Sequence, residues 1–438
     1  MGLKRRIGLA AAFTLIALLY AGLLYVWNWY DIAVFSNWVI AFKELGLLKL
    51  YEAPRVFGVR FRNVYPPLAP IFYVANYELA EKMVYLISAI LGMHQAPEYL
   101  VLPALKLLLY LAIGVVGYVL WRRLGAEAAV AWFLGAPTVA IAAAYNFDVF
   151  IALLILASLY AAYRGAIYAS SILLALAVLI KPLPAVFYLP LLVIVYRLRG
   201  RGAAAKYLLA GVLTGAAILA PFLAIDARST LYWMIGFHAE RPPQGPSIML
   251  FFRLLGTQPP HLLWLAAFTA LTIPVVLLAY RRPSRSPERL GLLLVAMMAA
   301  YLAVGKVVNP QYYIWVYPLL LLAAIPSSTA AVIAYNIGCA STSLYYLLSF
   351  IAGMATGHVF IEDEERWYST TYLLKSSLHP ALRGKVAHLL HDKPFTEAAV
   401  ILHNNWHIVA AVLAAINIAA MIIVYVEALR MYKRKHAA

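Results

Sequence analysis

The sequence predicts an all-α polytopic integral membrane protein, and three observations support that prediction. Apolar residues make up 65% of the 438 residues and charged residues only 12%, whereas a globular chain carries about 25% charged residues. The mean hydropathy is +0.82. Apolar runs close to the length of a bilayer-spanning helix, about 20 residues, recur along the whole chain. Together these observations exclude a soluble fold.

The first helix follows a basic N-terminus. Lys4, Arg5 and Arg6 precede an apolar run that extends from Ile7 to about Trp27. A cleaved signal peptide has an apolar region of about 7–15 residues followed by a small-residue cleavage site. This run is longer and ends in aromatic residues. We therefore expect a retained first helix whose N-terminus lies in the cytoplasm.

Further apolar runs bring the expected total to about 12 transmembrane helices. They are 97–121, 124–145, 148–163, 166–180, 183–197, 206–225, 261–280, 289–305, 311–325, 328–352 and 400–426. If each run crosses once, the short basic loops all fall on the side of the N-terminus, as expected for cytoplasmic loops. These loops contain Arg122/Arg123, Arg164, Arg197/Arg199/Arg201, Arg281/Arg282/Arg285/Arg289 and Lys433/Arg434/Lys435. Both termini are then cytoplasmic.

The net charge of +17 follows from the same arrangement. The chain has 35 Lys and Arg residues against 18 Asp and Glu residues. In a soluble protein such an excess suggests nucleic acid as a partner, but in an apolar chain it indicates membrane orientation. We therefore expect no nucleic-acid partner. The single cysteine, Cys339, excludes a disulfide framework.

A long first external loop is expected over 28–96. The segment 66–93 is apolar, but Glu78, Glu81 and Lys82 lie in its middle, where charge is costly inside a bilayer. We therefore expect an interfacial helix there. The stretch 32–50 alternates apolar and charged residues at helical spacing and predicts a second amphipathic surface helix.

Ionisable residues at the outer ends of the expected helices form the candidate site. They are Asp31, Asp148, Lys181, His238, Arg241 and Lys306. Each has a structural alternative. A lysine at a membrane interface often extends its ammonium to water, and Asp148 is placed to cap the helix that follows it. Asp31 follows an aromatic belt, where an interfacial acid is common.

Six short motifs, in order along the chain, resemble those of membrane glycosyltransferases that use polyprenyl-phosphate sugars, the GT-C superfamily. They are Tyr30-Asp31-Ile32-Ala33-Val34-Phe35, Tyr65-Pro66-Pro67-Leu68, Asn146-Phe147-Asp148, Lys181-Pro182-Leu183-Pro184, Phe237-His238-Ala239-Glu240-Arg241-Pro242 and the segment from Lys306 to Trp315. The chain is most similar to the transferase of the first GPI-anchor mannose and to related archaeal and bacterial mannosyltransferases. The likeness covers about residues 25–320.

The resemblance implies a GT-C-like catalytic module at 1–325, with C-terminal helices and an external segment 357–399 in 326–438. It implies an inverting transfer of mannose, or another hexose, from a polyprenyl- or dolichyl-phosphate donor to an acceptor hydroxyl. The acceptor would be a glycan, a glycolipid (GPI-like or other) or a protein. Transfer would occur on the extracytoplasmic side of a prokaryotic cell membrane, or of the ER membrane in a eukaryote.

Roles follow for the candidate residues. A phosphate leaving group departs as an anion and needs no acid, so one general base suffices, and we assign it to Asp31. The donor phosphate is expected to contact Lys181, Lys306, Arg241 and His238. Asp148, Tyr65, Gln311 and Tyr312 are expected to bind substrate.

A divalent cation remains open as a cofactor. The GPI enzymes carry two acids in an Asp-X-Asp pair in the first loop, whereas here Trp29 stands two residues before Asp31. Asp31 and Asp148 could still share an ion. The rival function is a non-enzymatic transporter or a flippase of lipid-linked sugars. Transporters commonly show internal repeats and broken helices near the midplane, whereas here the ionisable residues gather at one face.

Overall fold

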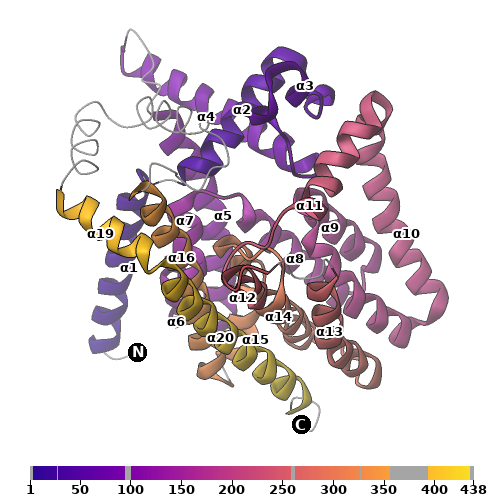
Figure 1. Ribbon diagram of the computed structural model, residues 1–438. Coiled ribbons are helices and arrows are strands. Elements are labelled where there is room, and N and C mark those ends of the chain that lie inside the picture. Colours follow the sequence, from indigo (N-terminus) through magenta and orange to yellow (C-terminus); the bar gives the residue numbers. More distant parts are fainter. Residues whose placement is uncertain are drawn as a thin grey trace.

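The computed structural model describes residues 3–26, 28–93, 100–257, 262–325, 327–355 and 393–434. Over these residues the regular structure is helical, and the only β pairing is a single parallel bridge between Gln244 and Val307. Figure 1 shows the helices gathered into one bundle. The predicted all-α class is confirmed.

Six helices in the described residues are long and apolar enough to cross a membrane, which makes the chain a multi-pass membrane protein. They are α5 (Val101–Leu124), α10 (Tyr188–Leu231), α13 (Leu263–Arg281), α14 (Pro287–Val304), α16 (Thr329–Ala355) and α20 (Trp406–Arg434). Within α10, Gly200 has φ +84°, so the expected spans 183–197 and 206–225 lie on either side of non-helical backbone.

The other expected spans are shorter or bent. The expected run 124–145 forms α6 (Ala126–Leu134) and α7 (Ala136–Ala144), which are bent by 50° and together would make a seventh span. The break falls at Gly135, where an added Cβ would lie 2.2 Å from the Tyr317 hydroxyl oxygen. The shorter apolar helices are the part Ile7–Leu23 of α1 (Leu3–Leu23), α8 (Asp148–Tyr163), α9 (Ile167–Ile180) and α15 (Tyr317–Ala324).

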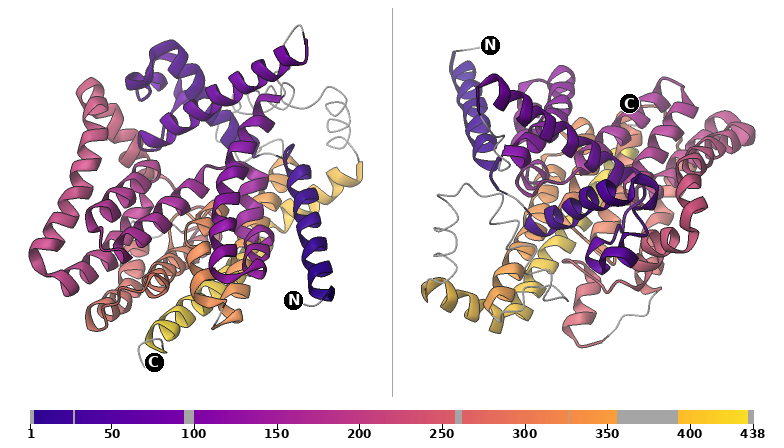
Figure 2. Two further views of the ribbon diagram at one scale, coloured as in Figure 1. Left: turned by 180° about the vertical axis from the view of Figure 1, so that it is seen from behind. Right: turned by 90° about the horizontal axis from the view of Figure 1, so that it is seen from above.

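The two helices expected in the first long loop are present as α2 (Trp29–Leu45) and α4 (Leu68–Ile90). Between them lie the short helices η1 (Leu47–Lys49), α3 (Ala53–Phe57) and η2 (Val59–Phe61). Two of the three charges that argued against a span are paired: Lys43 of α2 lies 3.4 Å from both Glu78 and Glu81 of α4. In Figures 1 and 2, α2 to α4 lie at the end of the bundle opposite to the start of α1 and the end of α20.

The core is centred on α14. Its residues from Leu290 to Val304 are all buried, and α13, α15 and α20 pack against it. Part of the expected external segment 357–399 lies outside the described residues, which resume at α19 (Lys393–Asn404). The central position of α14 matters for the site because the backbone that follows it carries Lys306 and Tyr312.

Candidate functional site

Most of the predicted site residues gather at one junction of the bundle. Asp31 lies in the first turn of α2, Asp148 begins α8, and Lys181 directly follows α9. Tyr65 precedes α4, and Tyr312 lies in the 3₁₀ helix η6 (Pro310–Trp315), which packs against α7 and α8. Segments far apart in the sequence therefore meet here.

Asp148 and Lys181 form a buried ion pair. Lys181 Nζ lies 2.6 Å from Asp148 Oδ2, and Trp315 Nε1 donates a hydrogen bond of 2.6 Å to Asp148 Oδ1. Asp148 is 0% and Lys181 2% exposed. The local geometry follows from the sequence, because Pro182 disfavours helical backbone in the preceding residue. Lys181 is accordingly extended, with φ −143° and ψ 140°, and its side chain leaves the axis of α9.

Three aromatic rings surround the Lys181 ammonium. Its Nζ lies 5.3 Å from the ring centre of Tyr65, 5.4 Å from that of Phe147 and 5.5 Å from that of Tyr312. Ring faces attract a cation within about 6 Å, and more strongly when water is excluded. Lys181 therefore lies among other predicted site residues, with its charge balanced by Asp148, and its expected contact with the donor phosphate stays a prediction.

Asp31 is half-buried and is held by two asparagine amides. Asn28 Nδ2 donates to Asp31 Oδ2 at 3.0 Å, and Asn146 Nδ2 donates to the same oxygen at 3.2 Å. Asn28 also caps α2, since its side-chain oxygen accepts from the Asp31 backbone N–H. Burial raises the pKa of Asp31 to about 6, although Lys181, the Asn146 amide and Arg241 act in the opposite direction.

The external loop motif brings cations to the same place. His238, in α11 (Phe237–Glu240), donates from Nε2 to the Val64 carbonyl at 2.7 Å. Lys306 Nζ donates to the Ala239 carbonyl at 2.7 Å. The Arg241 charge acts on Asp31 and on both site tyrosines. Burial and the nearby Arg241 charge lower the pKa of Lys306.

A single bridge fixes this loop against the chain that follows α14. The Gln244 N–H donates to the Lys306 carbonyl and the Val308 N–H donates to the Gln244 carbonyl, each at 2.8 Å. Arg241 donates to the Gln244 side chain. Gly245 permits the close approach, because its φ is +86° and an added Cβ would lie 1.9 Å from the Val308 carbonyl oxygen. The positions of Arg241 and Lys306 are thereby coupled.

Tyr312 and Gln311, the two predicted site residues in η6, differ in their contacts. Tyr312 packs on Trp315 at 4.8 Å between ring centres and faces Lys181. Gln311 is half-buried beside it, with no hydrogen bond to another described residue. Tyr312 is therefore placed among the charged groups, while the expected role of Gln311 stays a prediction.

A cation shared by Asp31 and Asp148 does not fit this arrangement. Both oxygens of Asp148 are already bound, one by Lys181 and one by Trp315. In the part of the chain that the structure describes, no three His, Cys, Asp or Glu side chains lie close enough to hold a metal ion. We therefore derive no step through a resident metal.

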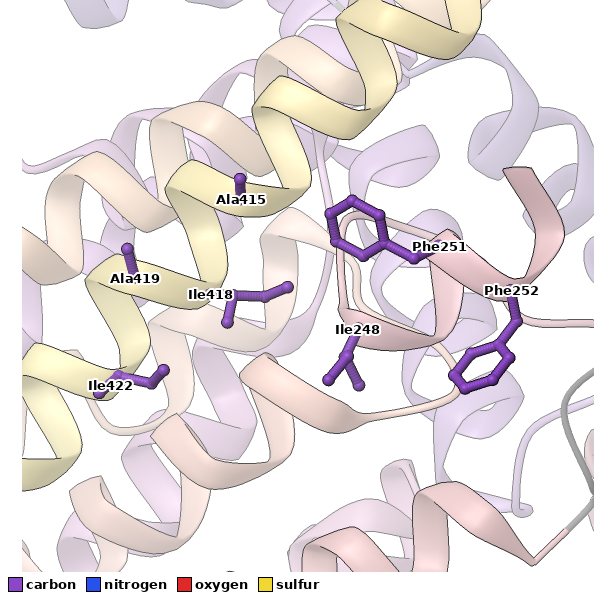
Figure 3. A pocket seen from close by; sticks show the side chains of 7 residues that line it. All are labelled: Ile248, Phe251, Phe252, Ala415, Ile418, Ala419 and Ile422. Atoms are coloured by element: carbon purple, nitrogen blue, oxygen red, sulfur yellow. The ribbon is translucent and has the colours of Figure 1, made fainter. Parts of the chain in front are cut away.

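An apolar groove lies close to the external loop that contains His238 and Arg241, here called the cationic loop. Figure 3 shows side chains of α12 (Ile248–Leu254) facing those of α20 across it. The groove has a volume of about 580 Å³ and is lined by Ile248, Phe251, Phe252, Ala415, Ile418, Ala419 and Ile422. The Ser247 hydroxyl donates to the Gly305 carbonyl at 2.7 Å. Ser247 directly precedes Ile248 of the groove, and Gly305 directly precedes Lys306.

Sequence reasoning gave no role to several residues that complete the site. Trp315 and Phe147 were within the noted motifs, and Asn146 preceded Asp148, but nothing local indicated their partners. Asn28 offered the clearest signal, since an asparagine three residues before an acid at a helix start is typical of an N-cap. The contacts of Trp315 and Asn146 span 167 and 115 residues of sequence and require the fold.

Comparison with known proteins gives one family. Residues 64–305 match the model of glycosyltransferase family 87. The matched range includes Tyr65, Asp148, Lys181, His238 and Arg241, and it begins after Asp31 and ends just before Lys306. No curated protein matches the chain.

Proposed function

Because the chain belongs to glycosyltransferase family 87, we propose that this site transfers mannose from a polyprenyl- or dolichyl-phosphate donor to an acceptor hydroxyl. The observation that carries the proposal is the setting of Asp31, a half-buried carboxylate with Lys181 and Arg241 close enough to influence its ionisation. Family membership makes the chain a glycosyltransferase and gives no support to the transporter or flippase alternative.

Asp31 is the proposed general base. A base works best when its pKa lies near the operating pH, and the pKa of Asp31, raised to about 6, leaves it mostly ionised at neutral pH. It takes the proton of the acceptor hydroxyl as that oxygen attacks the anomeric carbon. The phosphate departs on the opposite side with the bonding electron pair. One in-line displacement inverts the anomeric configuration, and no second carboxylate is needed, in contrast to glycosidases.

The cations of the loop are the proposed binding site for the donor phosphate. Arg241 offers two parallel N–H donors and lies in the same external loop as His238, and the bridge joins this loop to the segment that carries Lys306. Lys181 supplies a further charge once the incoming phosphate competes with Asp148 for its ammonium. Tyr65, Tyr312, Gln311 and Asp148 are proposed to bind hydroxyls of the sugar or of the acceptor.

The apolar groove supports a lipid-linked donor. A polyprenyl chain carries no polar group to satisfy, and the groove between α12 and α20 offers only aliphatic and aromatic side chains. The hydrogen bond from Ser247 to the Gly305 carbonyl, next to Lys306, supports a groove close to the proposed phosphate site. We propose that the donor phosphate binds at Arg241 and Lys306 with its isoprenoid chain along this groove, on the extracytoplasmic side of a cell membrane.

A donor assay tests the proposed function. Purified protein is incubated with radiolabelled polyprenyl-phosphate mannose or polyprenyl-phosphate glucose, together with a lipid extract of the source cells. We expect label to move from the mannose donor into the extract, with inversion at the anomeric carbon. Transfer from the glucose donor alone would overturn the choice of mannose. Transfer from neither donor would overturn the proposed function.

A further inference from the structure

The junction between α7 and α8 contains two energetically unfavourable features, a strained backbone and a buried amide oxygen without a partner. Tyr145 has φ +51°, and no other non-glycine residue among those described has a positive φ. Such backbone is strained for an aromatic residue. The next residue, Asn146, is 1% exposed, and its Oδ1 has no hydrogen-bond partner in the described structure. A buried amide oxygen without a donor is destabilising.

The orientation of the Asn146 amide explains the unpaired oxygen. Its Nδ2 donates to Asp31 Oδ2, and the opposite orientation would place Oδ1 against a carboxylate. Asn28 Nδ2 donates to the same oxygen from the other side. The interaction with Asp31 therefore determines which end of the Asn146 amide stays unsatisfied.

Both asparagines extend from backbone that is tied together. The Asn28 N–H donates to the Ala144 carbonyl at 3.0 Å, which joins the end of α7 to the start of α2. Lys106 of α5 is fully buried, and its ammonium donates to the carbonyls of Leu23, Val26 and Ala143, the last at 3.1 Å. One buried cation thus binds the ends of both α1 and α7.

We propose that Asn28 and Asn146, the amide pair, are positioning residues that fix Asp31 Oδ2 so that Asp31 Oδ1 is presented to the acceptor hydroxyl. Asp31 Oδ1 accepts no hydrogen bond from the described residues, which leaves it available for that proton. The inference rests on the proposed function, because the amide pair has this role only if Asp31 is the base of a glycosyl transfer.

Loss of one amide has a defined electrostatic consequence. The other charged or titratable groups that act on Asp31 are Lys181, Arg241, Asp148, Tyr65, Tyr312 and Tyr346. None of these is removed with Asn146. A carboxylate that loses a hydrogen-bond donor is less stable in its ionised form, so its pKa rises. Because the base must be ionised, the acid limb of the rate profile moves to higher pH.

The test is Asn146→Leu, which keeps the branched shape of the side chain, in a larger volume, and removes both polar ends. We expect kcat to fall at least tenfold, KM for polyprenyl-phosphate mannose to stay within about twofold, and the acid limb to rise by about one pH unit. The thermal midpoint in detergent should stay close to that of the wild type, because removal of the unpaired oxygen offsets the loss of a donor to Asp31. Lower activity without lower stability is a result that a purely structural role would not give.

The matched control is Thr138→Val. Thr138 lies in α7, is 0% exposed, and its hydroxyl has no partner in the described structure. Removing that hydroxyl should leave kcat and the pH profile unchanged, with the thermal midpoint equal or higher. Asn28→Ser is the second variant, since serine preserves the helix cap but lacks the amide donor. It should shift the acid limb in the same direction as Asn146→Leu.

Two results would overturn the inference while leaving the proposed function intact. One is a wild-type kcat and pH profile in Asn146→Leu. The other is a loss of activity in that variant that follows a loss of thermal stability, with Asn28→Ser unchanged in its pH profile. If the wild-type protein itself transfers no sugar from either donor, the proposed function fails first.

Discussion

Asp148 is held by partners that arrive from two other elements, and its burial makes each of them important. With Lys181 removed, the carboxylate would stay inside the protein, and its one remaining side-chain partner among the described residues would be the Trp315 N–H. Taking one partner from a buried ion pair typically costs about 3–5 kcal/mol, far more than the pair itself contributes to stability. The pair therefore determines how well the junction tolerates substitution.

We predict that Lys181→Met lowers the thermal midpoint by several degrees and abolishes transfer. The double variant Asp148→Asn/Lys181→Met should recover much of the stability, because a neutral amide still accepts from Trp315 and no charge stays buried. Thermal unfolding in detergent measures both. A Lys181→Met protein as stable as the wild type would show that Asp148 does not depend on its partner.

Sequence reasoning reached this site only in part. Asp31, Asp148, Lys181 and Arg241 were named as candidates because charged residues at helix ends in an apolar chain are few. Their pairing was beyond reach, since nothing near Lys181 in the sequence indicates Asp148 as its partner. The amide donors were missed for a related reason: asparagine is common in turns, and its role here depends on contacts between distant segments.

At the scale of elements, the apolar runs predicted the positions of the helices well, but they did not predict the breaks within a run. The run 124–145 was expected as one span, but α6 and α7 are bent at Gly135, where Tyr317 approaches and donates to the Ala131 carbonyl at 2.9 Å. The expected span 311–325 begins with the 3₁₀ helix η6. The break at Gly135 follows from packing against Tyr317, which hydropathy does not report.

The bridge between the cationic loop and the chain after α14 gives an element-scale prediction. Gly245→Ala adds a Cβ that would collide with the Val308 carbonyl, on backbone with φ +86°. We expect the bridge to open, Arg241 and Lys306 to separate, and KM for the donor to rise at least tenfold. Gly256→Ala is the control, because Gly256 also has a positive φ, +69°, but has no atom within 4 Å of an added Cβ.

Steady-state kinetics with both alanine variants separates two effects of Gly245→Ala, the backbone strain at positive φ and the clash with the Val308 carbonyl. The account requires Gly256→Ala to keep the KM of the wild type while Gly245→Ala loses donor affinity. An equal change in the two variants would mean that the bridge does not position the phosphate site.

At the scale of the whole molecule, the arrangement of the ends agrees with the expected topology. The start of α1 and the end of α20 lie at one end of the bundle, and α2 to α4 lie at the other (Figures 1 and 2). The site residues Asp31 and Tyr65 belong to the latter group of segments. We expect the net charge of +17, much of it in the short basic loops, to reflect the orientation of the chain in the membrane.

Cysteine labelling tests this orientation with little background. The only native cysteine, Cys339, is buried. Glu44 of α2 and Arg201, next to the break in α10, are both exposed. A membrane-impermeant maleimide added to intact cells should label Glu44→Cys and should label Arg201→Cys only after the cells are opened. The reverse pattern would place the site on the cytoplasmic side.

The central claim is that Asp31 is the base of a glycosyl transfer. Its most direct test compares the wild type with Asp31→Asn. Asparagine keeps the shape of the side chain, and its carbonyl oxygen can still accept hydrogen bonds, but it cannot take the proton of the acceptor hydroxyl. Transfer of label from polyprenyl-phosphate mannose is followed across pH 5 to 8. The account predicts wild-type transfer that rises with pH through about 6, following the raised pKa of Asp31, and a loss of at least a thousandfold in Asp31→Asn at every pH. Transfer by Asp31→Asn at the wild-type rate would contradict it.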